Sequence, residues 1–299
     1  MGMHSHEAKG SRLVLVIILN VVITVAQIVG GVISGSLALL SDALHNFSDV
    51  SALTISHVAR TISRKKATRR GTFGYKRAEI IAALFNSSVL VGIGIYLIYE
   101  SFVRFYAPQH INSEWVIVLG LLGVVVNGGS IWLLEAEAEG NMNIKSAYLH
   151  LLGDTLTSAA VVAGGVAMHF WQTYWVDPLV SIIIAIYLIY ASLSLIMEST
   201  AVLMEFAPSH IDLEEIAGAV AAEPDIKNIH HIHIWRLNDK EVYLQAHIDF
   251  SRNLTLEETT RRLEKLESML RERFGITHAV LQPEYMKNDD KGVIYDKGE

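Results

Sequence analysis

The sequence predicts a membrane protein in two parts, an all-α bundle of six transmembrane helices and a small C-terminal α+β domain. Long apolar runs are confined to the chain up to about residue 205, and the remainder has the composition of a soluble domain. Charged residues make up only 18% of the chain, which is low for a soluble protein. We expect a tail at 1–11, the six-span domain at 12–206, the soluble domain at 207–287 and a disordered tail at 288–299.

Six stretches are apolar enough to cross a membrane, and each has the length of about 20 residues that a span requires. They lie at 13–33, 37–60, 78–103, 114–134, 146–170 and 178–203. The loop after the second stretch, from Arg60 to Arg77, is rich in Lys and Arg, whereas the other short loops are not. Because positively charged loops stay in the cytoplasm, this loop is expected there and, with six spans, so are both termini. No cleavable signal peptide is expected at the start.

The soluble part shows the order αββαβ. We expect a helix at 212–222, strands at 229–237 and 242–250, a helix from Thr255 to Gly275 and a strand at 277–284. Thr255 and Glu258 have the spacing of a capping box, Asp212 begins a similar motif, and Gly275 is a typical helix end. This order predicts a small α+β sandwich with both helices on one face of the sheet.

Two of the expected spans each carry a His and an Asp four residues apart, His45 with Asp49 and His150 with Asp154. This spacing puts both side chains on one face of a helix, and an ionisable residue inside a span indicates a functional site because it is costly there. If the two faces meet, two imidazoles and two carboxylates form a four-ligand metal site that suits Zn²⁺. The alternative is two independent pairs, each satisfied within its own helix.

Metal ions and protons would compete for these four side chains. Zinc requires neutral His and ionised Asp, so its binding releases protons and acidification ejects it. This competition predicts a metal/proton exchange. Asp42, one turn before His45, either supplies water or protons to the site or caps the start of its span. Asp177, which precedes Pro178, is expected to cap the sixth span.

A second group of potential ligands lies in the soluble part. It comprises His230, His231 and His233 on the first expected strand, His247 on the second, and His278, Gln282 and Glu284 on the third. Strand alternation places His231 and His233 on one face and His230 on the other. Convergence of these side chains could bind one or two zinc ions at a subunit interface, and the alternative is a solvated, His-rich sheet edge.

Other classes of function lack their signatures. The chain has no Cys, which excludes disulfides and thiolate metal sites. An intramembrane zinc protease would carry His-Glu-x-x-His, but Asn46 follows His45 and Leu151 follows His150. A metal sensor that only signals would need a catalytic or DNA-binding appendix, for which the soluble domain is too small. We therefore expect no enzyme and no nucleic-acid partner.

Taken together, these residues resemble the cation diffusion facilitator family of metal exporters over about 12–287. The resemblance rests on the segments 41–49, 73–79, 126–127, 146–154, 230–235 and 278–284. It implies a homodimeric, six-helix metal/proton antiporter of the zinc type, embedded in the lipid of a prokaryotic cell membrane. Such a protein would export Zn²⁺, and also Cd²⁺, from the cytoplasm in exchange for H⁺ by alternating access.

The resemblance also assigns residues. His45, Asp49, His150 and Asp154 fall on the family's transport-site positions. The soluble part would be a cytoplasmic, ferredoxin-like, metal-sensing domain that binds a regulatory zinc ion through His230, His247 and Glu284, with His233 and His278 as nearby candidates. Gln282 stands where some members have a further His.

Overall fold

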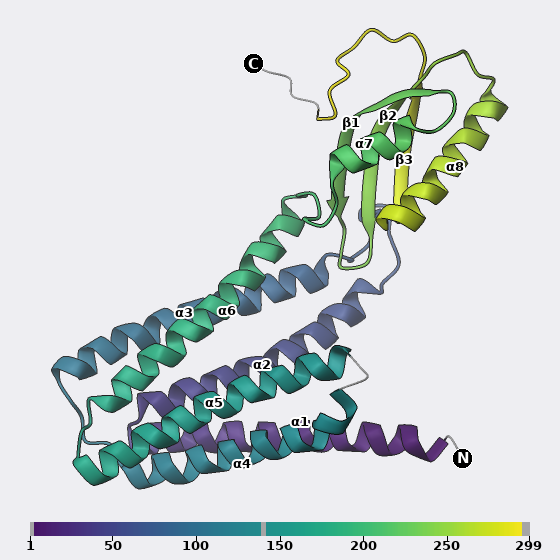
Figure 1. Ribbon diagram of the computed structural model, residues 1–299. Coiled ribbons are helices and arrows are strands. Elements are labelled where there is room, and N and C mark those ends of the chain that lie inside the picture. Colours follow the sequence, from purple (N-terminus) through teal and green to yellow (C-terminus); the bar gives the residue numbers. More distant parts are fainter. Residues whose placement is uncertain (1–2, 139–141, 295–299) are drawn as a thin grey trace. The chain divides into compact units, whose positions relative to one another are not determined.

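The computed structural model describes residues 3–138 and 142–294, and within these ranges the chain forms eight helices and three strands (Figure 1). The chain divides into two compact units. One holds the chain up to Val58 together with Ala83–Ile196, and the other holds Ala59–Ala82 and the chain from Met197 onward. The first unit contains the body of the helical bundle, and the second contains the α+β domain.

Each of the six expected spans lies in one helix of the bundle. These helices are α1 Met3–Ser34, α2 Leu37–Ser63, α3 Ala78–Tyr106, α4 Ser113–Ala138, α5 Met142–Trp171 and α6 Val176–Leu203. Among the described residues, the stretches long and apolar enough to cross a membrane are Ala78–Tyr106, Ser113–Trp132, His150–Trp171 and Val176–Leu203. The side chains of α1 are described from Ile18 onward, and its apolar part within them is Ile18–Ser34. The helix α2 is more polar because it carries the expected ligands. The prediction of a six-helix bundle followed by an α+β domain is confirmed.

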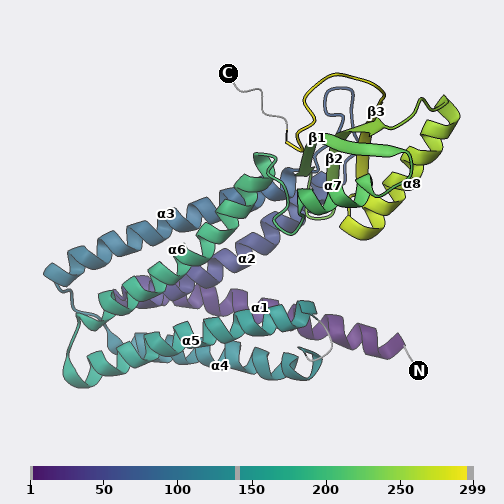
Figure 2. The same cartoon turned by 45° about the horizontal axis from the view of Figure 1, so that its top comes forward.

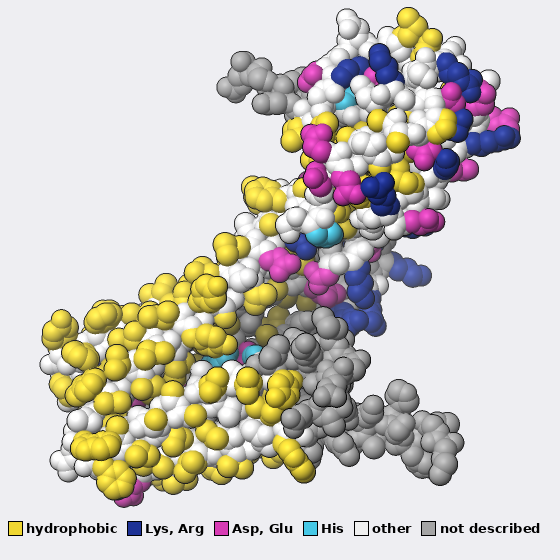
Figure 3. Space-filling model, in the orientation of Figure 1, with side chains coloured by type: hydrophobic (Ala, Val, Ile, Leu, Met, Phe, Trp, Pro, Cys, Tyr) yellow, Lys and Arg dark blue, Asp and Glu magenta, His cyan; other side chains and the backbone are white. Residues whose placement is uncertain are grey.

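Within the bundle, α4 packs against α1 and α5, and α3 runs beside α6 in both views (Figures 1 and 2). The largest buried apolar cluster of the bundle joins α2, α4, α5 and α6 through Ala38, Leu39, Val116, Leu119, Val161, Met168 and Ile184. Large apolar side chains such as Val22, Phe85 and Ile183 remain exposed on the outside. Apolar side chains cover the visible face of the bundle in Figure 3, as a surface that faces lipid requires.

The start of α2 is held by a carboxylate from α6. Asp177 accepts hydrogen bonds from Leu37 N at 2.7 Å and Ala38 N at 3.3 Å. The Ser36 hydroxyl donates to the same carboxylate at 2.5 Å. These bonds satisfy N–H groups that the first turn of a helix leaves without partners. Asp177 therefore caps α2. The prediction that it caps the sixth span, α6, is wrong.

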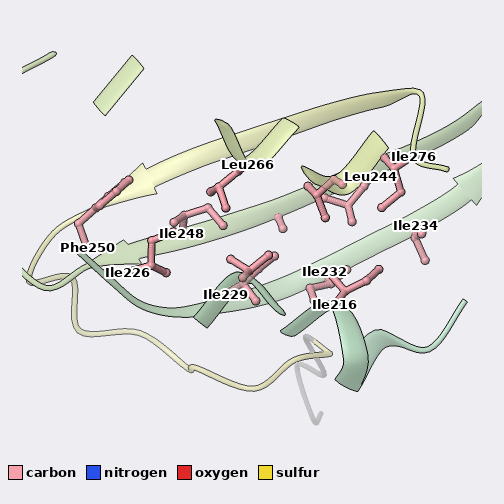
Figure 4. Packing of buried hydrophobic residues seen from close by; sticks show 13 residues of the cluster. Ile216, Ile226, Ile229, Ile232, Ile234, Leu244, Ile248, Phe250, Leu266 and Ile276 are labelled. Atoms are coloured by element: carbon pink, nitrogen blue, oxygen red, sulfur yellow. The ribbon is translucent and has the colours of Figure 1, made fainter. Parts of the chain in front are cut away.

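The α+β domain contains α7 Leu213–Ala221, β1 Ile226–Arg236, β2 Val242–Phe250, α8 Leu256–Phe274 and β3 His278–Glu284. The strands lie in the order β1-β2-β3, with β2 antiparallel to β1 and parallel to β3. Figure 4 shows Ile216 of α7 and Leu266 of α8 packing onto sheet residues such as Ile229 and Ile248. One core thus covers one face of the sheet, which leaves the other face to polar side chains.

The expected helix ends of this domain are present. Asp212 accepts a hydrogen bond from Glu214 N, and Thr255 and Glu258 form the reciprocal bonds of a capping box. Gly275 ends α8 with a φ of 69°, a left-handed conformation that glycine adopts without strain.

The last described residues of the chain are ordered beside the sheet, although a disordered tail was expected there. Residues 288–294, which we expected in a disordered tail, run beside β1, where His231 N donates to Gly292 O and Ile232 N donates to Val293 O. The remainder of that tail, 295–299, lies outside the described residues, as do the first two residues of the expected N-terminal tail.

Candidate metal centres

The four side chains expected in the bundle come together between α2 and α5. On each helix the spacing of four residues points His and Asp in one direction, and the two faces meet. His45 and Asp154 are buried, whereas the Asp49 and His150 side chains keep 33% and 46% of their surface exposed. In Figure 3, His and acidic atoms reach the surface between the apolar side chains of the bundle.

The shortest contacts of this cluster cross from one helix to the other. His45 Nε2 lies 3.2 Å from Asp154 Oδ1, and His150 Nε2 lies 3.3 Å from Asp49 Oδ2. Contacts within one helix are longer, at 3.9 Å between His45 and Asp49 and 3.7 Å between His150 and Asp154. His45, Asp49 and Asp154 form one group whose ligand atoms lie within 4.8 Å of one another, and His150 adjoins this group through its contact with Asp49. The arrangement does not match two self-satisfied pairs.

The cluster suits a divalent metal ion in both geometry and charge. His45 Nε2, Asp49 Oδ2 and Asp154 Oδ1 are buried and form no hydrogen bond with described residues. Such atoms are costly to bury unless a ligand satisfies them. Tetrahedral zinc with bonds of about 2.0 Å separates its ligand atoms by about 3.3 Å, which is close to the two distances between the helices. Two ionised carboxylates would also balance the charge of the ion.

Asp42 is fully buried next to this cluster and is held by hydrogen bonds from two other helices. Gln27 of α1 donates to it at 3.0 Å, and Thr157 and Ser158 of α5 donate at 2.9 Å each. Gln27 in turn accepts a hydrogen bond from Asn46 at 3.3 Å. Asp42 therefore fixes α2 against α1 and α5, and it does not cap α2, since Asp177 and Ser36 do so.

The second cluster lies on the sheet face away from the helices. His230 of β1 pairs with His247 of β2, and Asp249 of β2 pairs with Glu284 of β3. His247 Nδ1 lies 2.9 Å from Glu284 Oε1, and His230 Nε2 lies 3.4 Å from Glu284 Oε2. His247 Nδ1 is buried and has no hydrogen-bond partner among the described residues. Three of the expected ligands thus converge.

A bulge in β1 decides which histidines face this cluster. The register of β1 shifts between His230 and His233, and His231 has a φ of 51°. The His231 ring lies 4.9 Å from that of His230 and 5.0 Å from that of His247. The prediction that His231 and His233 share a face opposite His230 is therefore wrong, because simple alternation does not continue through a bulge.

The two further candidates of the soluble part lie elsewhere on the sheet. His233 is exposed and pairs with Gln245. His278, at the start of β3, pairs with Tyr243, and the two rings lie 4.9 Å apart. Neither belongs to the groups of described residues that could hold a metal ion together.

The protonation states at the second cluster favour metal binding. Burial, together with the positive charge of Lys291, lowers the pKa of His230, so its ring is neutral near pH 7. Burial alone raises the pKa of Glu284, but the hydrogen bond from Lys287 brings it below its ordinary value. Neutral imidazole and ionised carboxylate are the forms that bind metals.

Sequence reasoning missed one potential ligand, Asp289. Its Oδ1 lies 3.8 Å from His230 Nε2, and it belongs to a group with His230, His247 and Glu284 whose ligand atoms lie within 4.8 Å of one another. A single Asp in a polar tail has no periodicity that could have revealed this placement.

A six-helix apolar bundle with converging imidazoles and carboxylates, joined to an α+β domain with a similar cluster, defines a multi-pass membrane protein suited to binding divalent cations. The comparison with known families identifies the class further. The model of the cation efflux transmembrane domain matches residues 13–204, and that of the cation efflux protein cytoplasmic domain matches residues 208–286. The chain belongs to the cation diffusion facilitator family, in its zinc-type branch, which is a family of transporters and not of enzymes.

Several curated relatives match almost the whole chain. The metal cation efflux system protein CzcD of Cupriavidus metallidurans is 35% identical over 284 residues, 93% of this chain and 89% of that protein. The cadmium, cobalt and zinc/H⁺-K⁺ antiporter of Bacillus subtilis is 35% identical over 97% of this chain and 95% of its own. The zinc transporter ZitB of Escherichia coli is 32% identical, covering 87% and 82%.

Proposed function

We propose that the protein exports Zn²⁺, and also Cd²⁺, from the cytoplasm in exchange for H⁺ across the cell membrane of a prokaryote. His45, Asp49, His150 and Asp154 bind the ion during transport. The observation that carries this proposal is the crossed arrangement of these side chains, with distances of 3.2 and 3.3 Å between α2 and α5. The names of the relatives, which include a zinc transporter and a cadmium, cobalt and zinc antiporter, support the choice of metals.

Proton exchange follows from the chemistry of the four ligands. Each side chain binds either a proton or the metal through the same atoms, so the loading of one releases the other. The ion would bind from the near-neutral cytoplasm and displace protons from the four ligands. It would leave when the site faces a more acidic exterior and the imidazoles take up protons. Alternating access to a site inside the bundle converts the proton gradient into export.

The remaining parts of the proposal concern topology and regulation. The Lys- and Arg-rich segment between α2 and α3 supports a cytoplasmic location for this loop, for both termini and for the α+β domain. The protein acts as a homodimer in the lipid bilayer. His230, His247 and Glu284 bind a regulatory zinc ion in the α+β domain, and the convergence of both rings on the Glu284 carboxylate, at 3.4 and 2.9 Å, supports this assignment.

Zinc uptake into proteoliposomes that contain a lumenal pH dye tests the exchange. Zinc added outside should enter, and the lumenal pH should rise because protons leave. Asp49→Asn should abolish both signals, whereas His169→Gln, at the far end of the helix that carries His150, should retain them. Zinc entry without a lumenal pH change would identify a facilitator that is not coupled to protons.

A further inference from the structure

The last described segment of the chain crosses the edge of the second metal centre. This segment, residues 287–294, is called the strap below, and it follows β3 as the yellow loop near β1 in Figure 1. Gly292 O and Val293 O accept hydrogen bonds at 3.1 and 2.8 Å from the backbone of β1 at His231 and Ile232. The strap is therefore anchored beside the sheet at Gly292 and Val293, and the residues before this anchor reach the cluster through their side chains.

The strap brings two ammonium groups to the cluster. Lys291 Nζ lies 2.9 Å from Asp249 Oδ2 and 3.5 Å from Glu284 Oε2, and it also pairs with Asp289. Lys287 Nζ lies 2.5 Å from Glu284 Oε1 and 3.2 Å from Asp289 Oδ2. Three carboxylates thus share two cations that belong to the protein itself.

Lys291 also contacts the ring nitrogen through which His230 would bind a metal ion. His230 Nδ1 lies 3.1 Å from the amide oxygen of Asn228, and since that oxygen only accepts, Nδ1 is the donor. The lone pair of His230 is therefore on Nε2, and Lys291 Nζ lies 3.3 Å from that atom. A divalent ion bound to His230 would need the same lone pair. An ammonium group and a divalent cation repel each other and cannot both be accommodated there.

We propose that Lys291 is a built-in competitor for the regulatory metal ion, and that Asp289 is a further ligand delivered by the strap. Divalent-cation binding to His230, His247 and Glu284 displaces the Lys291 ammonium group, while Asp289 stays and turns from the lysine to the metal. Displacement shifts the strap, so metal occupancy becomes a change at the surface of the α+β domain. Lys291 thereby raises the zinc concentration at which the domain responds. This inference rests on the second metal centre of the proposed function.

The test uses the full-length protein in detergent, with Asp49→Asn and Asp154→Asn present so that zinc binding reports the α+β domain. Zinc affinity is measured by competition with a fluorescent chelator. Lys291→Met keeps the length of the side chain and removes its charge. We expect it to raise zinc affinity by roughly tenfold to a hundredfold, the equivalent of one hydrogen bond to a charged group. Adding Asp289→Asn should then lower the affinity again by about tenfold.

The movement of the strap is read separately. Because the chain has no Cys, a nitroxide on Asn288→Cys labels the strap alone. Its mobility should change over the same zinc concentrations as binding, and at lower concentrations when Lys291→Met is present. Lys240→Met, which alters an exposed lysine of the same domain, should leave both titrations unchanged.

The outcomes separate the two proposals. In one outcome, His247→Ala abolishes zinc binding but Lys291→Met leaves the zinc affinity unchanged. This result would overturn the role of Lys291 and would support the second metal centre. In the other outcome, the α+β domain binds no zinc, either with Lys291 or with Lys291→Met. This result would overturn the second metal centre and also the proposal that Lys291 competes with the metal ion. The transport site is tested independently by zinc flux in the protein without the two Asp→Asn changes.

Discussion

The two His/carboxylate clusters differ in where their balancing charge comes from. In the bundle, His45, Asp49, His150 and Asp154 contact one another, and no Lys or Arg forms an ion pair with them among the side chains that the structure describes. In the α+β domain, Lys287 and Lys291 pair with the carboxylates of the cluster.

Under the proposed function, this difference gives the two clusters different tasks. A cluster without its own cations must take its positive charge from outside, as a metal ion or as protons, and this alternation is what an exchanger requires. A cluster with resident ammonium groups is neutralised already, so a metal ion binds only when it outcompetes them. The first arrangement favours turnover, and the second favours a response above a threshold concentration.

Removal of one carboxylate from the bundle cluster should have the largest effect. Asp49→Ala or Asp154→Ala removes a ligand and half of the balancing charge, so zinc flux in proteoliposomes should fall by about a hundredfold or more. Size-exclusion chromatography should show that each variant retains the folded dimer. Wild-type flux in either variant would refute the assignment of the transport site.

The two clusters should also respond differently to pH. Protons compete with zinc for all four ligands of the bundle cluster, so zinc affinity there should fall as the pH is lowered from about 7 to 5.5, by about tenfold per pH unit for each proton displaced. At the second cluster, burial and the charge of Lys291 lower the pKa of His230, so protons compete for that ligand only at lower pH. The affinity there should fall less steeply over the same range.

Zinc-binding isotherms at several pH values test this contrast. They compare the Asp49→Asn/Asp154→Asn protein, which reports the α+β domain, with the His230→Ala/His247→Ala protein, which reports the bundle. Equal pH slopes in the two proteins would remove the contrast between the clusters.

Metal selectivity should shift by about one order of magnitude when an imidazole of the bundle is replaced. His45→Asp makes the ligand set richer in oxygen, which suits Mn²⁺ better, so the preference for Zn²⁺ over Mn²⁺ should fall about tenfold. Competition between the two metals for transport gives this ratio directly. His57→Asp, on the same helix but outside the cluster, serves as the matched control. An unchanged ratio in His45→Asp would mean that selectivity lies in other residues.

The sequence predicts those features that depend on local patterns. Apolar runs locate the six helices, and the i, i+4 spacing identifies His45 with Asp49 and His150 with Asp154. Helix caps such as Thr255 and Gly275 are equally local, since each depends on residues within a few positions.

Features that depend on distant partners could not be predicted. Asp177 stabilises the start of a helix 140 residues earlier in the chain, whereas its neighbour Pro178 suggests a cap of its own helix. The polar tail has the composition of a disordered segment, yet Lys291 is held there by carboxylates of β2 and β3. The bulge at His231 likewise depends on pairing with β2, which strand alternation does not encode.

The smallest effect is expected from a helix cap in the α+β domain, and it tests whether transport through the bundle depends on the stability of that domain. Thr255→Ala removes the side chain that accepts a hydrogen bond from Glu258 N at the start of α8. A lost cap costs about 1 kcal/mol, so amide exchange in the first turns of α8 should accelerate about fivefold in hydrogen-exchange mass spectrometry. Thr260→Ala, which is in the same helix but outside the cap, should change these rates less. Because the change is confined to the α+β domain, zinc flux at saturating zinc should stay at the wild-type level. A fall in flux that matches the loss of the cap would show that the stability of this domain limits transport, and it would contradict the division of tasks between the two clusters.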